Sequence, residues 1–325
     1  MSRPITVNVG PLATADADGI TLSQKAASAA QYLAINGALT DGTTSNNIAQ
    51  VQNPAGAGNL TLNGTLVSGG VAYLGRMRRV YFTCAGDETD VTFTVTGTGI
   101  NAMGGVFAVV DSFVGANASI RASTKQFYTI TTIATTGAGS GNISVGASGD
   151  ATLDVARRVI ITSGGDDTGI TFTITGTDPS GGTISEAVTG VNGAAASSVL
   201  SYKTVTSVLT SGAVTTTVTV GTNGVADSPW VRFDDYGAHA EVAIQASVTG
   251  TANFTVRQTL QDPNSASDPV ADESIVWVDH PDSAVVAATA TAQANYAYPP
   301  VFAKVVLNSG TGSVSTVFRQ VFTGH

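Results

Sequence analysis

The sequence is poor in cysteine, in charged residues and in aromatic residues. Its 325 residues include one cysteine, and charged and aromatic residues make up 11% and 6% of the chain. A single cysteine excludes an intrachain disulfide and any metal site built from several thiolates. That cysteine, Cys84, ends the strand-like run Val80–Cys84, which favours a small buried side chain over a reactive thiol.

Long apolar runs are also missing. No stretch approaches the roughly 20 apolar residues of a membrane helix, and the opening residues Met1–Val7 hold no apolar signal-peptide core. We therefore expect a protein that is made in a cytosol and does not contact membranes. The 23 acidic and 14 basic residues give a formal net charge of −9, which argues against general affinity for nucleic acid.

Motifs for catalysis are scarce. The chain has no Gly-Lys-Ser or Gly-Lys-Thr phosphate loop, no Gly-x-Ser-x-Gly elbow and no His-Glu-x-x-His pair. Of the three histidines, His239, His280 and His325, His280 lies between two aspartates in the segment Asp279–Asp282. Such a histidine suits a general base or a metal ligand, although a loop histidine beside proline more often serves the turn. We predict no catalytic, cofactor-binding or metal-binding residues, no cofactor and no enzyme activity.

Acidic residues offer two candidates for cation binding. The segment Asp16–Gly19 resembles the start of a calcium loop, but the bidentate acid expected eleven residues after Asp16 is replaced by Ala27. A denser acidic group lies in a proline-containing excursion near the C-terminus. Solvated loop charge is the simpler interpretation of this group, and a bound cation is the alternative. Its members are Asp262, Asp268, Asp272, Glu273, Asp279 and Asp282.

What the chain does have is a duplicated block. Its first copy contains Arg78-Arg79-Val80, Gly86-Asp87 and Thr92–Thr98, and these return 79 residues later as Arg157-Arg158-Val159, Gly165-Asp166 and Thr171–Thr177. Further on the offset is 75, because Phe127–Ile133 corresponds to Tyr202–Val208. The four-residue difference belongs in a loop. The duplication indicates a repeated unit of about 75 to 80 residues.

The repeated unit is rich in β-strand patterns. In Thr92–Thr96 and Thr171–Thr175 the threonines alternate with apolar residues, which is typical of strands with one buried and one solvated face. The acids of Asp87-Glu88 and Asp166-Asp167 recur with the turns between strands. We therefore predict an all-β fold of tandem, immunoglobulin-like antiparallel sandwiches over residues 57–148, 149–224 and 225–325.

Two groups of side chains have a structural and a functional interpretation. The pairs Arg78-Arg79 and Arg157-Arg158 lack the companions of a nucleic-acid site, so they are interpreted as charges that protect a strand edge or bond a neighbouring module. The aromatic and proline segment Tyr296–Pro300 is either an interface anchor or the start of a strand packed on the third core.

Residues 1–56 differ from the rest in composition. The stretch 21–34 has high helix propensity but only a thin apolar stripe. It is interpreted as an arm with a short helix that docks on a neighbouring subunit, with a mobile tail or an intramolecular cap as alternatives. Under the arm hypothesis, deleting residues 1–52 leaves a folded protein that no longer joins larger particles.

Several separated motifs together resemble a group of tailed-bacteriophage proteins encoded among virion structural genes. The resemblance covers roughly residues 55–320 and rests on motifs that agree in order. They are Gly56–Gly64, the repeated Arg-Arg-Val, Gly-Asp and Thr-Phe-Thr blocks, Gly221–Gly224, and the segment from Trp277–Pro281 to Tyr296–Tyr298. The resemblance implies a particle component of β-sandwich modules without enzyme activity, and it brings no catalytic residues.

The expected function is therefore a non-enzymatic virion structural protein, assembled in the host cytoplasm. Capsid decoration or cement is the first hypothesis. A neck, collar or tail accessory protein is one alternative, and a receptor- or glycan-binding appendage is another. The expected partners are major capsid, neck or tail proteins and further copies of the same chain, with neither nucleic acid nor membrane among them.

Overall fold

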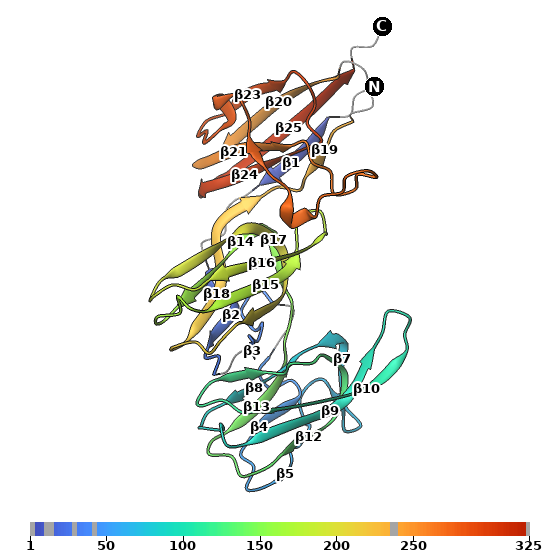
Figure 1. Ribbon diagram of the computed structural model, residues 1–325, viewed down its shortest axis with the longest axis vertical. Coiled ribbons are helices and arrows are strands. Elements are labelled where there is room, and N and C mark those ends of the chain that lie inside the picture. Colours follow the sequence, from blue (N-terminus) through green and yellow to red (C-terminus); the bar gives the residue numbers. More distant parts are fainter. Residues whose placement is uncertain (1–3, 10–15, 28–30, 41–43, 235–239, 323–325) are drawn as a thin grey trace.

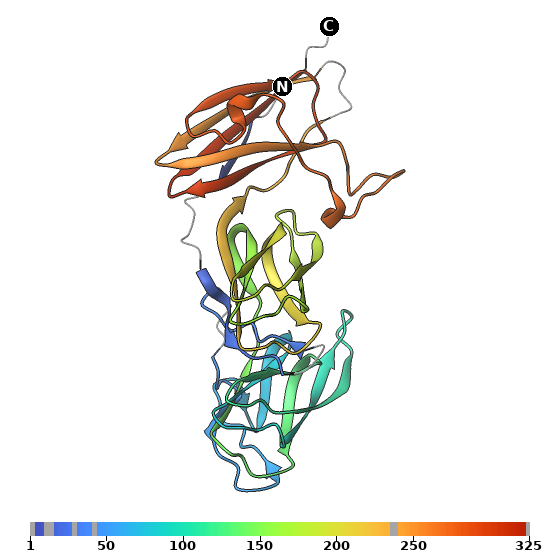
Figure 2. The ribbon, with the colours of Figure 1, turned by 60° about the vertical axis from the view of Figure 1, so that its left-hand side comes forward.

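The computed structural model describes residues 4–9, 16–27, 31–40, 44–234 and 240–322. Strands and loops make up nearly all of them, with two 3-10 turns, η1 (Asp272–Ser274) and η2 (Ser283–Val285). The predicted all-β class is confirmed, whereas the immunoglobulin-like topology stays a prediction. Three β-sandwich bodies are stacked along the long axis of the molecule, and we call them the first, second and third modules (Figures 1 and 2).

The first module is formed by residues 44–147. Its two sheets have the strand orders β10-β9-β12-β7-β6, with β5 beside β12, and β11-β8-β13-β4. Aromatic side chains such as Phe82, Phe93 and Phe127 fill the core between these sheets. The strands are β4 (Ala49–Gln52), β5 (Gly58–Asn59), β6 (Val67–Ser68), β7 (Val71–Arg78), β8 (Val80–Cys84), β9 (Thr92–Ile100), β10 (Val106–Val114), β11 (Ile120–Ala122), β12 (Phe127–Thr135) and β13 (Ile143–Ala147).

The second module repeats the first with longer strands. Strand β14 covers the positions of β7 and β8, and β17 covers those of β11 and β12, at the offsets found in the sequence. The core contains Phe172, Tyr202 and Val220. The strands are β2 (Asp16–Gln24), β3 (Gln31–Tyr32), β14 (Ala151–Ser163), β15 (Thr171–Thr177), β16 (Thr183–Thr189), β17 (Ala195–Thr210) and β18 (Val218–Asp227).

The third module has its own topology. One sheet has the order β1-β25-β20-β23, and in the other β24 pairs with β21, β19 and the end of β18. Phe233, Phe254 and Phe318 lie in the core between them. The strands are β1 (Ile5–Val9), β19 (Val231–Arg232), β20 (Ala240–Thr249), β21 (Ala252–Thr259), β22 (Val278–Asp279), β23 (Ala292–Tyr296), β24 (Phe302–Gly310) and β25 (Ser313–Phe322).

The beginning of the chain runs through all three modules before the chain returns. Strand β1 belongs to the third module, β2 and β3 to the second, and β4 to β6 to the first (Figure 1). In each module the early strand pairs antiparallel with the strand that closes the module, as β1 with β25, β2 with β18 and β4 with β13. Each module is therefore completed by residues far from it in sequence.

The early part of the chain holds a second, shorter duplication that the sequence analysis did not identify. The segment Leu33-Ala34-Ile35-Asn36-Gly37 returns 27 residues later as Leu60-Thr61-Leu62-Asn63-Gly64. Gln24 bonds both backbone groups of Ala34 through its amide, at 2.8 and 3.0 Å, and Gln52 does the same to Thr61 at 2.9 and 3.0 Å. The two copies lie in different modules, the first copy in the second module and the second copy in the first.

The expected helix over residues 21–34 is wrong. Its described residues form the end of β2, the strand β3 and loops, while residues 28–30 lie outside the described part of the chain. Alanine-rich sequence favours a helix locally, but pairing with β18 and burial of Ile20 and Thr21 outweigh that small preference. Of the three alternatives for this region, packing within the chain is the one observed. Deleting residues 1–52 would remove strands from every module.

The paired glutamines predict a difference in stability. Gln24 is buried, so Gln24→Ala leaves the Ala34 backbone groups without partners and costs about 1–3 kcal/mol. The more exposed Gln52 provides the matched control. Both tryptophans lie where the second and third modules meet, so urea unfolding followed by their fluorescence should shift for Gln24→Ala. An equal shift for Gln52→Ala would contradict the assignment of Gln24 to the second module.

Candidate functional site at the junction of the second and third modules

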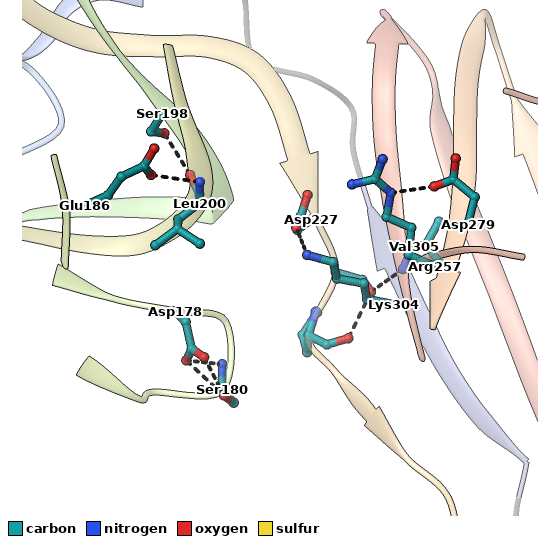
Figure 3. Close-up of polar contacts among 12 residues, drawn as sticks. Asp178, Ser180, Glu186, Ser198, Leu200, Asp227, Arg257, Asp279, Lys304 and Val305 are labelled. Carbon is teal, nitrogen blue, oxygen red and sulfur yellow. Dashed lines mark hydrogen bonds and ion pairs between the residues drawn. The ribbon is translucent and has the colours of Figure 1, made fainter. Parts of the chain in front are cut away.

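A cleft of about 200 Å³ lies between the second and third modules. The β15–β16 hairpin and the part of β17 around Leu200 form one wall. The other wall comes from β21, from β24, from the end of β18 with Trp230 after it, and from the acidic loop, which we define as residues 262–282. Figure 3 shows Asp178 on the first wall, with Glu186 behind it in the second module, and Lys304 and Arg257 on the second wall. Charged and aromatic side chains lining the cleft are Arg158, Asp178, Asp227, Trp230, Arg257, Asp272, Glu273, Trp277 and Lys304.

The wall from the second module is held rigid by its turn. Asp178 is buried and accepts hydrogen bonds from the backbone N–H groups of Ser180 and Gly182, at 2.9 and 2.8 Å. Glu186 accepts from the backbone N–H groups of Val199 and Leu200, at 2.7 and 2.9 Å. These carboxylates are saturated with donors, which fixes the shape of the wall.

The wall from the third module combines tryptophans with an ion pair. The rings of Trp230 and Trp277 meet edge to face, with centroids 5.1 Å apart. Lys304 places its Nζ 4.6 Å from the centroid of Trp277 and 2.5 Å from Oδ2 of Asp227. The side chains of Lys304 and Asp227 are 11% and 4% exposed, so the pair is shielded from solvent. The lysine is thereby held against the ring rather than free to move.

The acidic loop closes the cleft at the hairpin tip. Asp272 in η1 lies directly against Gly182, where a β-carbon would collide with its Oδ2. Burial, followed by the charges of Asp178 and Glu273, raises the pKa of Asp272 above its usual range. The acidic loop therefore packs closely on the hairpin tip, although the carboxylates of Asp178 and Glu273 repel that of Asp272.

Arg158 gives the cleft an unsatisfied cation. Among the described residues, the side chain of Arg158 has no hydrogen-bond or ion-pair partner, and its Nε is buried. Its counterpart in the first copy, Arg79, stacks its guanidinium 3.3 Å from the ring centroid of Tyr32. Trp230 Nε1 and Ser201 Oγ beside the cleft also lack partners among the described residues. A cleft with a free guanidinium, indole rings and carboxylates suits a small polyhydroxylated ligand.

The residues that the sequence offered as catalytic or reactive are packed inside. His280 is 3% exposed, its ring centroid lies 4.4 Å from that of Tyr296 at an interplanar angle of 48°, and its Nδ1 accepts a hydrogen bond from the N–H of Asp282. Burial lowers the pKa of His280. Burial also raises the pKa of Cys84 to about 11, so its thiol is protonated at neutral pH. His239 and His325 lie outside the described residues.

The acidic candidates are dispersed over separate contacts. Asp262 pairs with Arg232 at 2.7 Å, Asp279 pairs with Arg257 at 2.8 Å, and Asp282 caps η2. In the ranges that the structure describes, no three His, Cys, Asp or Glu side chains gather as a metal site. Asp16 lies in β2, where its Oδ1 accepts from the N–H of Asp18 at 3.3 Å.

The recurring turn acids have matching roles in the two copies. Asp87 and Asp166 accept hydrogen bonds from the hydroxyls of Thr89 and Thr168, at 2.7 and 2.8 Å. The next residues, Glu88 and Asp167, are buried and accept backbone N–H groups from Gly141 and Thr215. These carboxylates tie the turn to the neighbouring loop.

The remaining candidates divide between core, junction and surface. Arg157 is buried against Asp154 through two bonds of 2.7 Å, while Arg79 and Arg158 each lie at a module junction. Tyr296 is buried in the third core, and Tyr298 is exposed. Sequence reasoning passed over Trp230 and Trp277 as a pair. Their scarcity in the chain was a signal, but their 47-residue separation concealed that they meet.

Comparisons with known proteins leave the family open. No family model and no curated protein matches the chain. One solved structure, described as the triple jelly roll fold and turret assembly in an archaeal virus, is 11% identical, covers 82% of each chain and has a TM-score of 0.17. Another, from Sulfolobus turreted icosahedral virus, is 12% identical, covers 83% of this chain and 89% of that chain, and has a TM-score of 0.15. Superpositions this poor carry no weight for fold or function.

The described part of the chain also contains no helix with the length and hydrophobicity needed to cross a membrane.

The raised pKa of Asp272 predicts a pH-dependent stability. When the pKa of a carboxyl group is raised in the folded state, its ionised form destabilises the fold, and this penalty is lost as pH falls through the raised value. Asp272→Asn should therefore raise the unfolding midpoint at pH 7, as followed by tryptophan fluorescence. The difference from the unsubstituted protein should shrink in acid. Asp268→Asn, in the same loop, is the control, and an equal gain from it would contradict the assignment.

Proposed function

We propose that the chain is a non-enzymatic structural subunit of a tailed-bacteriophage virion that decorates or cements the capsid surface. The observation that carries the proposal is the return path of the chain through three stacked sandwiches, in which early strands complete every module. The sequence resemblance described above agrees with such a role. A neck, collar or tail accessory protein is the nearest alternative.

A stack of three modules is suited to covering an extended area of a particle surface. Two segments of chain connect neighbouring modules, because each early strand lies in a module whose other strands come later in the sequence. At the first junction Arg76 pairs with Asp150 at 2.6 Å, and Ser148 Oγ accepts the N–H of Ile35 at 3.0 Å. A rigid subunit loses little conformational freedom on binding, and many weak contacts then act together on a repeating lattice.

Binding to particles tests the proposed function. The purified full chain should bind saturably to phage heads that lack it, and should raise the temperature at which those heads release DNA. Co-sedimentation with purified heads and with purified tails provides the measurement. Binding to tails alone would transfer the protein to the tail accessory class. Binding to neither particle would overturn the virion role.

The junction cleft favours a second candidate function, a glycan-binding appendage. The unpaired Arg158 and the rings of Trp230 and Trp277 offer a hydrogen-bond donor and aromatic surface in one recess. The equivalent arginine of the first copy is already occupied by Tyr32, which makes the open second junction distinctive. Carbohydrates are bound through this combination of ring stacking and hydroxyl hydrogen bonds.

A polysaccharide screen tests the second candidate. Host surface polysaccharide should bind the full chain, and Arg158→Ala should weaken binding about 10- to 100-fold, because a charged hydrogen bond is worth about 1.5–3 kcal/mol. Tyr298→Ala removes an exposed aromatic ring outside the cleft and should leave binding unchanged. Isothermal titration calorimetry gives the affinities. If the Arg158→Ala variant binds the polysaccharide as tightly as the unsubstituted protein, the cleft is not the glycan-binding site.

A further inference from the structure

The four residues by which the first copy is longer lie in one hairpin. The turns 101–105 and 178–182 correspond to each other, because the first residue of each turn accepts two backbone N–H groups through its side-chain Oδ1 at 2.8–3.0 Å. Beside the turn, β9 holds Gly99-Ile100 and β10 holds Val106-Phe107, which β15 and β16 lack. The longer hairpin projects from the first module in Figure 1. The insertion therefore lengthens both strands and keeps the turn.

The insertion carries an aromatic ring onto the inner side of this hairpin. Phe107 is two residues before the buried Val109, so both side chains lie on the same side of β10. The ring of Phe107 lies against Gly99 of the paired strand, where a β-carbon would collide with it. Phe107 is 48% exposed. It therefore extends the inner side of the sheet beyond the core, where the ring remains half exposed.

The ring of Phe107 forms part of an open groove of about 540 Å³, which we call the first-module groove. Strand β10 contributes the four residues Phe107–Val110. The backbone N–H of Ile100 donates to Sδ of Met77 at 3.2 Å, which ties the hairpin to β7. The remaining lining residues come from the segment around the end of β7 and from the residues before β12, and they are Met77, Arg79, Lys125 and Gln126.

The second copy contains the equivalent surface. Asp111 accepts the backbone N–H groups of the two residues that precede Gln126, at 2.7 and 3.0 Å, as its counterpart Glu186 does in the second module. The two surfaces are therefore built on the same scaffold. Four groove residues have counterparts that line the junction cleft, namely Arg79, Val109, Lys125 and Gln126 with Arg158, Ile184, Leu200 and Ser201.

In the second copy this surface is covered by the acidic loop. The turn η1 lies beside β16, and Asp272 packs directly against Gly182 at the hairpin tip. Ile275 follows in the same cleft and is 8% exposed. At Gly105, the counterpart of Gly182, the nearest side chain is that of Asn101 in the same turn. The described residues thus leave the first-module groove open where the second module is covered.

The charge of the first-module groove is opposite to that of the chain. Its lining residues include Arg79 and Lys125 and no carboxylate, whereas the whole chain has a net charge of −9. Asp111, in β10 next to the groove, is 5% exposed and is engaged by the N–H and the hydroxyl of Thr124. Leu200 stands in the place of Lys125 in the second copy, so this cation is a feature of the first copy alone. Two cations without an exposed acid favour an occupant with acidic side chains.

We propose that the first-module groove is a docking site for an acidic segment of another polypeptide. Carboxylates of the segment contact Arg79 and Lys125, and an aliphatic side chain packs on Phe107. The acidic loop offers the same combination to the second module through Asp272 and Ile275. Because the acidic loop is already packed on its own hairpin, the segment comes from a partner protein. This inference goes beyond the virion role and is tested on the isolated protein, so either proposal can fail without the other.

A synthetic peptide of residues 271–276 is the probe, because this segment covers the equivalent surface of the second module. Labelled with a fluorophore, it should bind the full chain saturably at micromolar concentrations, as measured by fluorescence anisotropy. A second peptide, with Asn and Gln in place of its two acids, should bind about 10-fold more weakly or worse, because charge-assisted contacts are lost. Added salt should weaken the binding of the acidic peptide only.

Substitutions in the groove locate the binding. Phe107→Ala removes a ring that the second copy lacks, and should weaken binding of the acidic peptide about 10-fold. Lys125→Leu introduces the residue of the second copy, and should weaken binding about 2- to 5-fold, as expected for one exposed charge. Lys25→Leu removes an equal charge outside the groove and should leave the affinity unchanged. All three variants should keep the circular dichroism spectrum of the unsubstituted protein.

Cross-linking gives the position of the peptide independently. A bromoacetyl group on the peptide should alkylate Gln126→Cys, in the groove, faster than Ser112→Cys, on the outer side of β10, after correction for their rates with iodoacetamide. The native Cys84 is buried. Absence of binding at millimolar peptide would overturn the inference. So would equal binding of the two peptides, an affinity that neither groove variant changes, equal alkylation of the two cysteines, or binding that only Arg158→Ala abolishes.

Discussion

The structure depends on the antiparallel pairing between the early strands and the strands that close each module. Strands β1, β2 and β4 each complete a sheet whose other strands are formed much later in the chain. Backbone pairing of this kind satisfies the polar groups of both strands, and it brings apolar residues such as Val9, Ile20 and Ile48 into the cores. Non-local pairing is slow to form because long loops must close first. The early strands cannot dock until the later modules are present.

The two copies of the repeated unit share their buried polar contacts and differ at positions outside the core. The polar scaffold of each copy is retained, down to the turn acids that accept a threonine hydroxyl and the serines Ser123 and Ser198 that accept the N–H of Val80 and Val159. These bonds satisfy buried groups, and replacing them would leave donors unpaired. Divergence is confined to positions that the fold tolerates. In one copy Arg79 lies over the ring of Tyr32, and in the other the guanidinium of Arg158 has no hydrogen-bond or ion-pair partner among the described residues.

The sequence predicted the strands and the repeat but not the path of the chain. Alternating runs such as Thr92–Thr96 fix which face is buried, so the all-β class followed from periodicity alone. The helix expected over residues 21–34 failed because local propensity is worth less than pairing with β18. The short motif around Asn36 and Asn63 is repeated, and this repeat could have shown that the early segments resemble each other. Its two copies belong to different modules, however, and the residues next to each copy do not indicate which module it joins. The junction cleft was equally out of reach, because Trp230, Trp277 and Arg158 come from separate elements.

By itself the sequence determined the secondary-structure class, the length of the repeated unit and the burial of Cys84, since each depends on neighbours within a few residues along a strand. Tertiary structure alone decided that the first residues are shared among three cores, that the two tryptophans meet, and that the acidic loop packs on the tip of the second module's hairpin. The physical reason is that these features arise where distant segments pack. Their stability depends on contacts between two surfaces, and the sequence of either segment alone does not specify those contacts.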